Sequence, residues 1–460
     1  MQPVKLFRVL ENLDLEYVSD RRSLRSFVLR SLSTDSRSLK KDDLFIAIAG
    51  EYFDGHSFIE SAVERGAGGV LFEMRSLDSV KTVVKKAPSV LFIGVKNTRR
   101  ALGKIAESYL GFFSLTKIAI TGSVGKTTTK GLVASVLSQR YDIVSSFQSY
   151  NNDIGVPKTV LEVNERTRFL VQEMGTNHPG EISNLSGIVH QNGAVITGIG
   201  PAHIGFFGSE LEIAREKKAA LEVLDRNGTA FLNADDRHFL FLKEGIVASV
   251  KSYGIHEGDV RPERIERIGL NGSVFMLWGR KIFAGVLGEH GILNAMAAAL
   301  VGFSYGLTID EVKAGIEAYK DESGRGNIRV VGGVTVIDES YNANPMSVSA
   351  SLRFLEQIQT DGKKVFVFGD MLELGDQSEY YHRKFAEEFK ATGIGYLYTY
   401  GPLASVTGSE VQKEGERMVR HFSDLDELIE SLRREALSGD VILVKGSRKM
   451  GLERVVNSFF

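Results

Sequence analysis

A glycine-rich turn with a lysine and two threonines is the most chemically specific pattern in the chain. It consists of Gly122, Ser123, Val124, Gly125, Lys126, Thr127 and Thr128. An apolar run at residues 117–120 predicts a strand before the turn, and apolar positions at helical spacing in residues 132–137 predict a helix after it. This strand–turn–helix order aims backbone N–H groups at phosphates, with Lys126 reaching the outer phosphates and Thr127 holding Mg²⁺. The predicted ligand is therefore ATP or GTP.

The turn departs from the strict phosphate-loop pattern at one position. That pattern has a glycine at position 120, where this chain has Ile120, so the chain carries a shorter form. The alternative is a glycine turn with an incidental lysine. The strand before the turn and the helix after it favour the phosphate loop.

Two polar residues are candidates for a magnesium shell near this loop. Glu173 follows the apolar run 169–171, and His203 follows the run 194–197 through residues 198–202. Acidic and imidazole side chains at the carboxyl ends of neighbouring parallel strands are placed where the shell should lie. Taken alone, each is more often an ordinary polar loop residue, and the phosphate loop favours the functional interpretation.

Lys217 lies on an apolar stripe of a predicted helix. It shares that stripe with Ile213, Ala220, Leu221 and Leu224, whereas Lys218 falls on a polar face. A buried lysine tends to lose its proton and to gain reactivity. The spacing alone favours the plainer alternative, in which the stem covers apolar surface while the ammonium reaches water.

Two further segments follow predicted strands of the last third of the chain. DESYNANP, residues 338–345, combines acids with two asparagines, and KGSRKMGLE, residues 445–453, is basic. Loops at the carboxyl ends of parallel strands are favoured binding positions. Ordinary solvated turns are the competing interpretation for both segments.

Length and composition limit the possible classes of protein. A chain of 460 residues is too long for one hydrophobic core, so we expect several domains. The 43% hydrophobic content and net charge of −2 indicate a folded protein with no global attraction to nucleic acid. The absence of cysteine excludes disulfides and thiolate chemistry. No secretory signal or membrane span is predicted, so we expect a cytoplasmic location.

The order of apolar runs predicts three α/β domains. Residues 1–113 combine runs at 44–48, 69–72 and 90–95 with helices at 58–65 and 99–110. Residues 114–327 alternate strands with amphipathic helices, which predicts a mainly parallel sheet. The polar segment 321–327 is interpreted as a linker. Residues 328–460 contain runs at 334–337, 365–368, 396–400 and 441–444, which predict a Rossmann-like, doubly wound sheet.

These motifs, in this order, resemble the Mur ligase family and within it the MurF branch. The first domain carries TDSR and DLFIAIAGEYFDGHSFI, the second ITGSVGKTTTK, NNDIGVP, EMGTNHPGEI and GPAHIGFFGS, and the third DESYNANP, FGDMLELGDQSEYYHR and VKGSRKMGLE. The resemblance runs almost end to end. It implies a UDP-substrate domain, a central ATP-binding domain and a C-terminal domain that binds nucleotide and D-alanyl-D-alanine. The implied reaction is ATP-dependent ligation of that dipeptide to UDP-N-acetylmuramoyl-tripeptide through an acyl phosphate.

The resemblance also implies roles for individual residues. Lys126, Lys217 and His203 are the implied catalytic residues, with Lys217 carbamylated by CO₂. One Mg²⁺ is assigned to Thr127 and Glu173, and a second to His203 and Lys217. Nucleotide contacts beyond the phosphate loop are assigned to Asn294, Arg325 and Asp338. Substrate contacts are assigned to Ser36, Arg37, Asn151, Asn152, Asn177 and His178, and the dipeptide pocket to Asn342, Asn344 and residues 447–449.

Two rival functions remain open at this point. A MurE-type ligase would add the third amino acid of the peptide, but the DNPR-type recognition motif expected there is absent from the third domain. A nucleotide switch would hydrolyse or exchange nucleotide without an acceptor. We expect a monomer that binds the two peptide substrates and no nucleic acid. The third residue of the tripeptide and the base for the attacking amine are not indicated by the sequence.

Overall fold

The computed structural model describes residues 1–50, 53–320, 324, 326–415 and 417–460. The chain divides into two compact units, which are described separately. The first comprises Met1–Lys117, Asp142–Met174 and Ser183–Gln191, and the second Ile118–Tyr141, Gly175–Ile182 and Asn192–Phe460. Within the described ranges, we find no helix with the length and apolar character that a membrane crossing requires.

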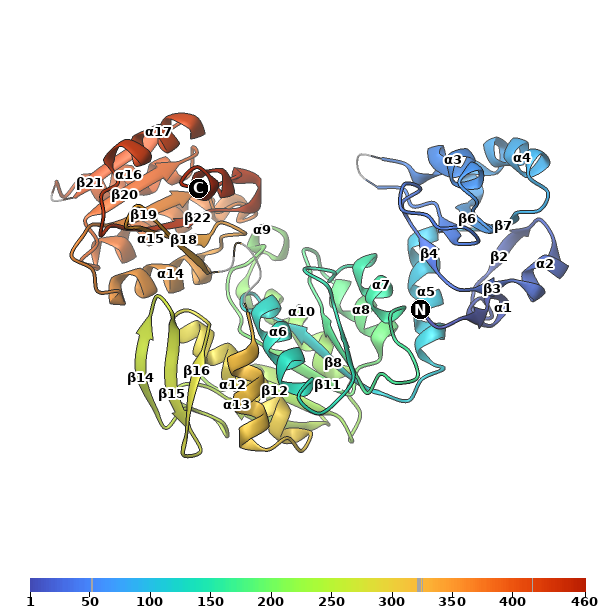
Figure 1. The fold of residues 1–460 in the computed structure, drawn as a ribbon, viewed down its shortest axis with the longest axis horizontal. Helices are drawn as coiled ribbons and strands as arrows, with labels where there is room; N and C mark the ends of the chain where they lie inside the picture. Colours follow the sequence, from blue (N-terminus) through green and yellow to red (C-terminus); the bar gives the residue numbers. More distant parts are fainter. Residues whose placement is uncertain (51–52, 321–323, 325, 416) are drawn as a thin grey trace. The chain divides into compact units, whose positions relative to one another are not determined.

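The first unit contains a five-stranded sheet with helices packed on it (Figure 1). Its strands, in spatial order, are β2 (Leu15–Val18), β7 (Leu91–Val95), β6 (Gly69–Glu73), β5 (Leu44–Ile46) and β4 (Leu32–Ser33). All pairs are parallel except β2 with β7. Phe45, Val70, Phe72 and Phe92 share one buried cluster with residues of the helices α3 (Ile59–Glu64) and α4 (Leu77–Lys86). The three predicted strands of this region are confirmed.

The first unit also contains a long helix, α5, and a series of shorter elements. They are β1 (Val4–Lys5), α1 (Leu6–Val9), α2 (Arg21–Ser26), β3 (Val28–Leu29), η1 (Gly55–Phe58), α3 (Ile59–Glu64), η2 (Met74–Ser76), α4 (Leu77–Lys86), α5 (Thr98–Leu110), β9 (Ile143–Ser145), α7 (Gly155–Val160) and β10 (Phe169–Glu173). Strands β9 and β10 pair in parallel. Helix α8 (Glu181–Val189) begins in the second unit and continues in the first.

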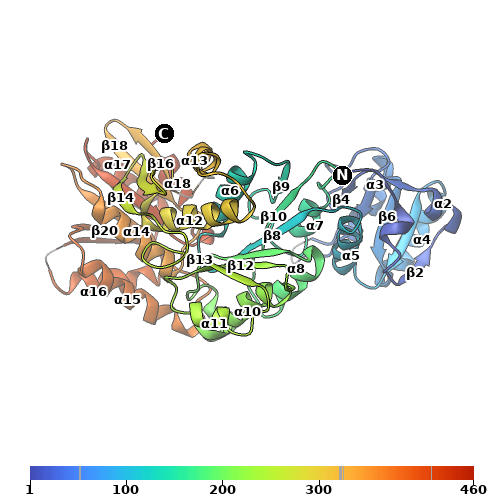
Figure 2. The ribbon, with the colours of Figure 1, turned by 90° about the horizontal axis from the view of Figure 1, so that it is seen from below.

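Four parallel strands position the phosphate loop of the second unit. They are β8 (Thr116–Thr121), β11 (Gly193–Ile196), β12 (Thr229–Asn233) and β13 (Ser249–Tyr253), paired in that order. The helices of this part are α6 (Lys126–Leu137), α9 (Ile204–Phe207), α10 (Glu210–Glu222), α11 (Phe239–Lys243), α12 (Gly288–Ser304) and α13 (Ile309–Ala318). Helix α6 packs beside α12 and α13 (Figure 2). The mainly parallel central sheet is confirmed.

An antiparallel sheet in the same part was not expected from the sequence. It consists of β14 (Arg264–Gly269), β15 (Gly272–Leu277) and β16 (Arg280–Ala284). The tight turn after β15 places Trp278 and Gly279 at positive φ, +46° and +70°. The Trp278 indole stacks on Phe303 of α12 with ring centroids 3.9 Å apart. The sheet is thereby attached to the long helix that also supports the phosphate loop.

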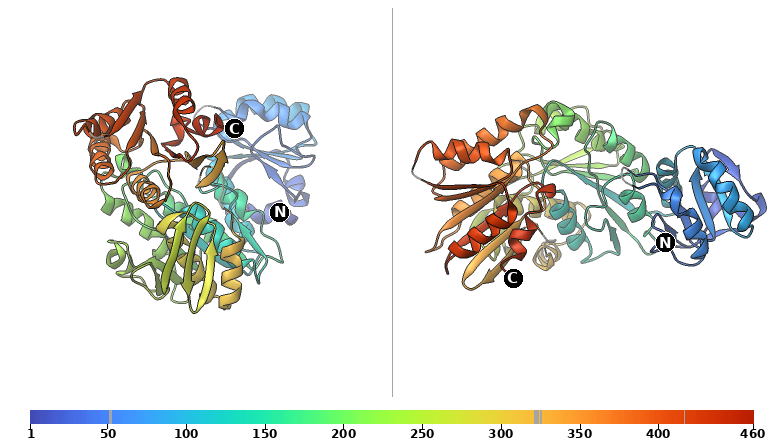
Figure 3. Two further views of the ribbon diagram at one scale, coloured as in Figure 1. Left: turned by 60° about the vertical axis from the view of Figure 1, so that its left-hand side comes forward. Right: turned by 90° about the horizontal axis from the view of Figure 1, so that it is seen from above.

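The last part of the second unit is a six-stranded sheet with helices on both faces (Figure 3). Its strands, in spatial order, are β17 (Asn327–Val331), β18 (Val334–Glu339), β22 (Val441–Lys445), β19 (Lys364–Gly369), β20 (Tyr396–Tyr400) and β21 (Met418–Phe422). Only β17 is antiparallel to its neighbour. The Rossmann-like class is confirmed, with an antiparallel strand at one edge.

Each face of this sheet has its own set of helices. Helices α17 (Leu425–Glu435) and α18 (Glu453–Asn457) share a buried core with alternate residues of β18, β22 and β19, such as Val336, Val444 and Val367. Helices α14 (Pro345–Gln357), α15 (Ser378–Lys390) and α16 (Ala404–Gln412) pack on one another, with α14 also on β19 and β22 and α16 on β20 and β21. The 3-10 turns η3 (Gly375–Gln377) and η4 (Arg448–Met450) follow β19 and β22.

The proposed domain boundaries near residues 113 and 327 stay predictions. The predicted linker 321–327 falls largely on residues 321–323 and 325, which lie outside the described residues, and Asn327 already begins β17. Arg325, assigned to the nucleotide by resemblance, also lies outside them.

Candidate functional site

The turn after β8 has the backbone of an anion-binding loop. Gly122 and Gly125 adopt φ of +150° and +77°, and α6 starts directly at Lys126. A Cβ atom at Gly122 would collide with the Thr197 hydroxyl, and one at Gly125 would lie 2.6 Å from Asn294 Oδ1. Only glycine fits both positions, because each combines positive φ with close neighbours. The turn therefore leads with glycine backbone directly into the N-terminus of a helix, the arrangement that binds anions.

Hydrogen bonds fix this turn to the neighbouring loop after β11. The Ser123 N–H donates to Gly198 O at 2.8 Å, and the Ser123 hydroxyl contacts Gly200 O at 2.9 Å and Gly200 N at 3.0 Å. Lys126 lies across the turn, with Nζ donating to Gly122 O at 2.9 Å. The residues predicted to bind phosphate are thus held together by these bonds. Lys126 could exchange Gly122 O for a phosphate oxygen as the acceptor of its ammonium group.

Asn294, the implied adenine contact, supports the turn from α12. Its side chain is nearly buried, and Oδ1 accepts from the Thr129 hydroxyl at 3.1 Å. Thr127, one residue into α6, is also buried at 2% exposure. The structure therefore brings Asn294 to the phosphate loop, and its contact with adenine stays a prediction.

Glu173 and Asn151, predicted for metal and substrate, contact each other in the first unit. Glu173 is the last residue of β10 rather than a residue after it, and it is 1% exposed. Its Oε1 accepts from Asn151 Nδ2 at 2.8 Å. Asn152 has a local role, because its Oδ1 accepts from the N–H of Gly155, the first residue of α7, at 2.8 Å.

The implied UDP-binding residues lie in the loop after β4. Ser36 is buried, whereas the Arg37 side chain is 84% exposed and pairs with Asp35 at 2.8 Å. Hydrogen bonds from Arg37 lower the pKa of the Asp35 carboxyl to about 2. Asp35 was not singled out in the sequence, although its place in TDSR next to Arg37 could have indicated it. Its carboxylate orients the guanidinium that the resemblance assigns to the nucleotide.

His203 contacts an acid that the sequence analysis did not identify. The histidine has φ +58°, and its Nδ1 lies 2.7 Å from Glu373 Oε2. Glu373 also accepts from Gly205 N through its backbone oxygen at 3.1 Å. The close histidine lowers the pKa of the Glu373 carboxyl. In this structure His203 therefore faces Glu373 rather than another predicted metal ligand.

Lys217 is buried over its whole length, with 3% exposure. The expectation that its ammonium reaches water is therefore wrong, because α10 packs this face against the protein interior. Lys218, expected on a polar face, is half-buried and donates to Phe241 O at 2.8 Å. Burial disfavours the charged form of a lysine, which is the condition for carbamate formation.

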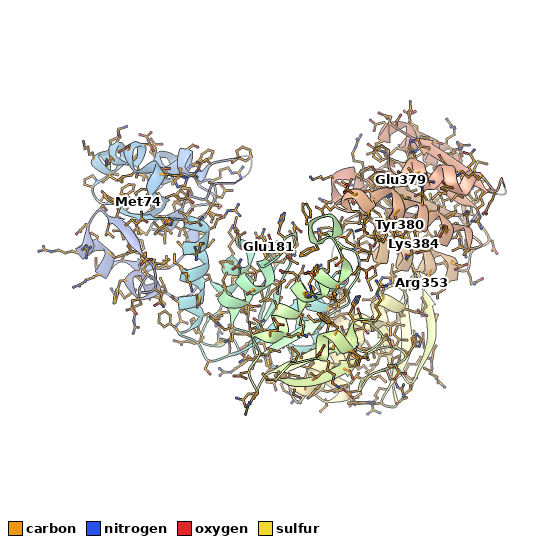
Figure 4. All side chains as sticks on the ribbon, turned by 180° about the vertical axis from the view of Figure 1, so that it is seen from behind. Met74, Glu181, Arg353, Glu379, Tyr380 and Lys384 are labelled. Atoms are coloured by element: carbon orange, nitrogen blue, oxygen red, sulfur yellow. The ribbon has the colours of Figure 1, made fainter. Side chains whose placement is uncertain are left out.

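Glu216, the neighbour of Lys217, was also missed. Its carboxylate accepts from Gly180 N at 2.7 Å and from Ile182 N at 2.8 Å, so it holds the loop before α8 against α10. That loop carries Asn177 and His178. Glu181, labelled in Figure 4, accepts from Asn177 N at 2.7 Å and orders the loop from its other end.

The DESYNANP segment is divided between strand and helix cap. Asp338 lies within β18, and its Oδ1 accepts from the Ser340 hydroxyl at 2.6 Å. Asn344 caps α14 by accepting from Ser347 N at 2.9 Å, and its Nδ2 lies 3.4 Å from Ser123 O of the phosphate loop. Asn342 is exposed and accepts from Ala343 N at 2.9 Å. Asn344 thus joins the loop after β18 to the phosphate loop. Asn342 is the asparagine of this segment that faces solvent.

No three His, Cys, Asp or Glu side chains gather as a ready-made metal cage among the residues that the structure describes. Mg²⁺ is commonly held by one or two carboxylates together with waters and substrate phosphates. The donors at hand, a buried threonine next to a phosphate loop and single acids or histidines at strand ends, fit that mode of binding.

Comparisons with known proteins agree with this arrangement. Three family models match: the catalytic domain of the Mur ligase family at residues 28–110, the Mur ligase middle domain at 120–302, and the glutamate ligase domain of Mur ligases at 324–448. A UDP-N-acetylmuramoyl-tripeptide--D-alanyl-D-alanine ligase of Bacillus subtilis is 34% identical over 93% of this chain and 93% of its own length.

Solved structures extend the likeness to the fold. A MurF crystal structure from Acinetobacter baumannii superposes with a TM-score of 0.89 at 28% identity, covering 99% of this chain and 98% of the other. A MurF ligase from Thermotoga maritima in complex with ADP gives a TM-score of 0.79 at 26% identity, covering 94% and 97%. The chain therefore belongs to the Mur ligase family, in its MurF branch.

Proposed function

We propose that this chain joins the amine of D-alanyl-D-alanine to the terminal carboxylate of UDP-N-acetylmuramoyl-tripeptide, converting ATP to ADP and phosphate. The observation that carries the proposal is the turn 122–125, whose two glycines at positive φ lead directly into the N-terminus of α6 as in a phosphate-binding loop. The relatives whose names state this reaction match the chain over more than nine tenths of its length.

The chemistry requires two transfers. The carboxylate oxygen of the tripeptide attacks the terminal phosphorus of ATP, the bond to the bridging oxygen breaks, and ADP leaves. The dipeptide amine then attacks the acyl carbon, and the tetrahedral intermediate expels phosphate and a proton to leave an amide. Lys126 and the turn's N–H groups stabilise the charge that accumulates on the phosphoryl oxygens.

We assign magnesium to the polar residues at the strand ends. Thr127 and Glu173 would hold one ion, and His203 with a carbamylated Lys217 a second. Bound Mg²⁺ would neutralise phosphate charge and orient the phosphates. The near-complete burial of Lys217 supports the carbamate, because a neutral amine is the form that adds to CO₂.

The peptide and nucleotide substrates are assigned by the same match. Ser36 and Arg37 would bind the UDP group, with Arg37 oriented by Asp35. Asn151, Asn152, Asn177 and His178 would line the path of the muramyl peptide, and Asn342 and Asn344 would border the dipeptide. Asp338 and Arg325 would complete the nucleotide contacts. We propose that the chain acts as a monomer. We also propose a cytoplasmic location, because ATP and UDP-linked precursors are made there.

The test is release of ADP from purified enzyme with ATP, Mg²⁺ and UDP-tripeptide. D-alanyl-D-alanine should raise ADP release at least about a hundredfold over the rate without acceptor, because amide formation requires both peptides. Single amino acids should not replace the dipeptide. Turnover with a free amino acid alone would indicate a ligase of the MurE type, and equal hydrolysis without any acceptor would indicate a nucleotide switch.

A further inference from the structure

Three loops converge at one edge of the C-terminal sheet. Strands β18, β22 and β19 are parallel neighbours, so the loops that follow them, residues 340–345, 446–450 and 370–377, leave the sheet at the same edge. The crevice at the carboxyl ends of such strands is where doubly wound sheets bind ligands. The dipeptide contacts assigned so far come from the first two loops only.

The third loop is held rigidly by its neighbours. Leu372 N donates to the Ser447 hydroxyl at 2.8 Å, and Ser447 N donates to Asp370 O at 3.0 Å. Met371 and Leu374 are buried on either side of the exposed Glu373. Glu373 therefore keeps its unusual φ of +65° because both flanking residues are anchored.

Glu373 presents a carboxylate to solvent beside a histidine and near a lysine. Its side chain is 42% exposed, and one oxygen lies 2.7 Å from the His203 ring. Lys449 of η4 is close enough to interact electrostatically with this carboxylate. The carboxylate therefore has one side on protein and the other side accessible to a ligand.

Three acids that lie in these strands or directly after them are already engaged within the protein. Asp370 is 3% exposed and accepts from Ala404 N at 2.7 Å. Glu339 pairs with Lys445 at 2.9 Å, and Asp338 accepts from Ser340. Of these four carboxylates, Glu373 is the one that an incoming cation can reach.

We propose that Glu373 binds the α-ammonium group of the incoming D-alanyl-D-alanine and so sets its position in the reaction. A dipeptide is a zwitterion whose two charged ends lie at most about 7 Å apart in an extended chain. Glu373 and the cation of Lys449 offer the complementary pair of charges. His203 occupies the carboxylate in this structure and would share it with the ammonium. The inference rests on the proposed function and adds a specificity residue to it.

Steady-state kinetics of Glu373→Gln provide the first test, with Asp376→Asn as the matched control. Asp376 is an exposed acid three residues away in the same loop. Loss of a charge-assisted contact should raise KM for the dipeptide about tenfold to a hundredfold. KM for ATP and for UDP-tripeptide should stay within about twofold, and the control should resemble the parent enzyme. A rise in all three KM values would indicate a merely structural residue and overturn the proposal.

Binding of an acceptor analogue separates the ammonium contact from any general effect. D-lactoyl-D-alanine replaces the ammonium by a hydroxyl, and its affinity can be measured by calorimetry with UDP-tripeptide and a non-hydrolysable ATP analogue present. The parent enzyme should bind the dipeptide about tenfold more tightly than this analogue, whereas Glu373→Gln should bind the two alike. A preserved tenfold preference in the variant would refute the assignment. Failure of the parent enzyme to use the dipeptide would instead refute the proposed function.

Discussion

The turn after β8 and the loops after β18 and β22 occupy equivalent positions at the ends of parallel strands, yet they are built differently. The turn after β8 relies on its backbone, with Gly122 and Gly125 at positive φ. The second relies on charged side chains held by partners, such as Glu339 on Lys445. Backbone N–H groups suit a phosphate, whose charge is spread over several oxygens, whereas a small zwitterion requires opposite charges at fixed points. Added bulk should therefore damage the first region, and altered charge the second.

Gly122→Ala should have the largest effect on catalysis. The added methyl group would collide with Thr197 at φ +150°, displacing the turn. Misplacement by about 1 Å costs on the order of a hundredfold in rate, so ADP release should fall at least that far. Gly279→Ala is the control, since φ there is +70° and no atom lies within 4 Å of the new Cβ. If the two variants are equally active, steric collision of an added methyl group is not what makes the turn after β8 sensitive to substitution.

Lys217→Ala tests whether the central region also depends on a carboxylate-like side chain. Loss of a buried metal-orienting group should lower turnover about tenfold to a hundredfold. Added formate or acetate should restore part of the rate if the lysine is carbamylated, and Lys218→Ala should not respond to either. Full activity of Lys217→Ala, measured as ADP release, would remove the carbamate from the mechanism.

Glu339→Leu tests the charged region and should act mainly on stability. It leaves Lys445 buried without its partner, because the two side chains are only 10% and 5% exposed. Loss of one member of such a pair should lower the free energy of unfolding by about 3 kcal/mol. Combining it with Lys445→Met should restore most of that loss in a denaturant titration. An unaltered midpoint in the single variant would show that charge does not hold this loop.

The parallel sheets were predictable because each buried strand is a short, β-rich apolar run. The run 396–400 matches β20, and the run 334–337 falls short of β18 only because Asp338 and Glu339 continue the strand as polar residues. The antiparallel sheet β14–β16 was missed. Its two outer strands, Arg264–Gly269 and Arg280–Ala284, mix charged residues with apolar ones, and the sheet interrupts an otherwise regular alternation of strand and helix.

The functional residues that could be predicted are those that lie next to one another in the sequence. The phosphate loop is contiguous, so its residues could be named from spacing. Glu216 and Glu373 act on residues that lie 34 or more positions away in the chain, through Ile182 and His203. No local pattern distinguishes such acids from the many charged residues of a solvated surface. The burial of Lys217 depends on how α10 packs, which helical spacing alone does not determine.

The stacked turn at Trp278 makes the chain a natural optical reporter. The sequence contains one tryptophan, and its indole is 51% exposed while in contact with Phe303 on α12. All indole emission therefore originates at this single point, on the helix that also carries Asn294. A nucleotide that shifts α12 would change the wavelength or intensity of that emission without any attached dye.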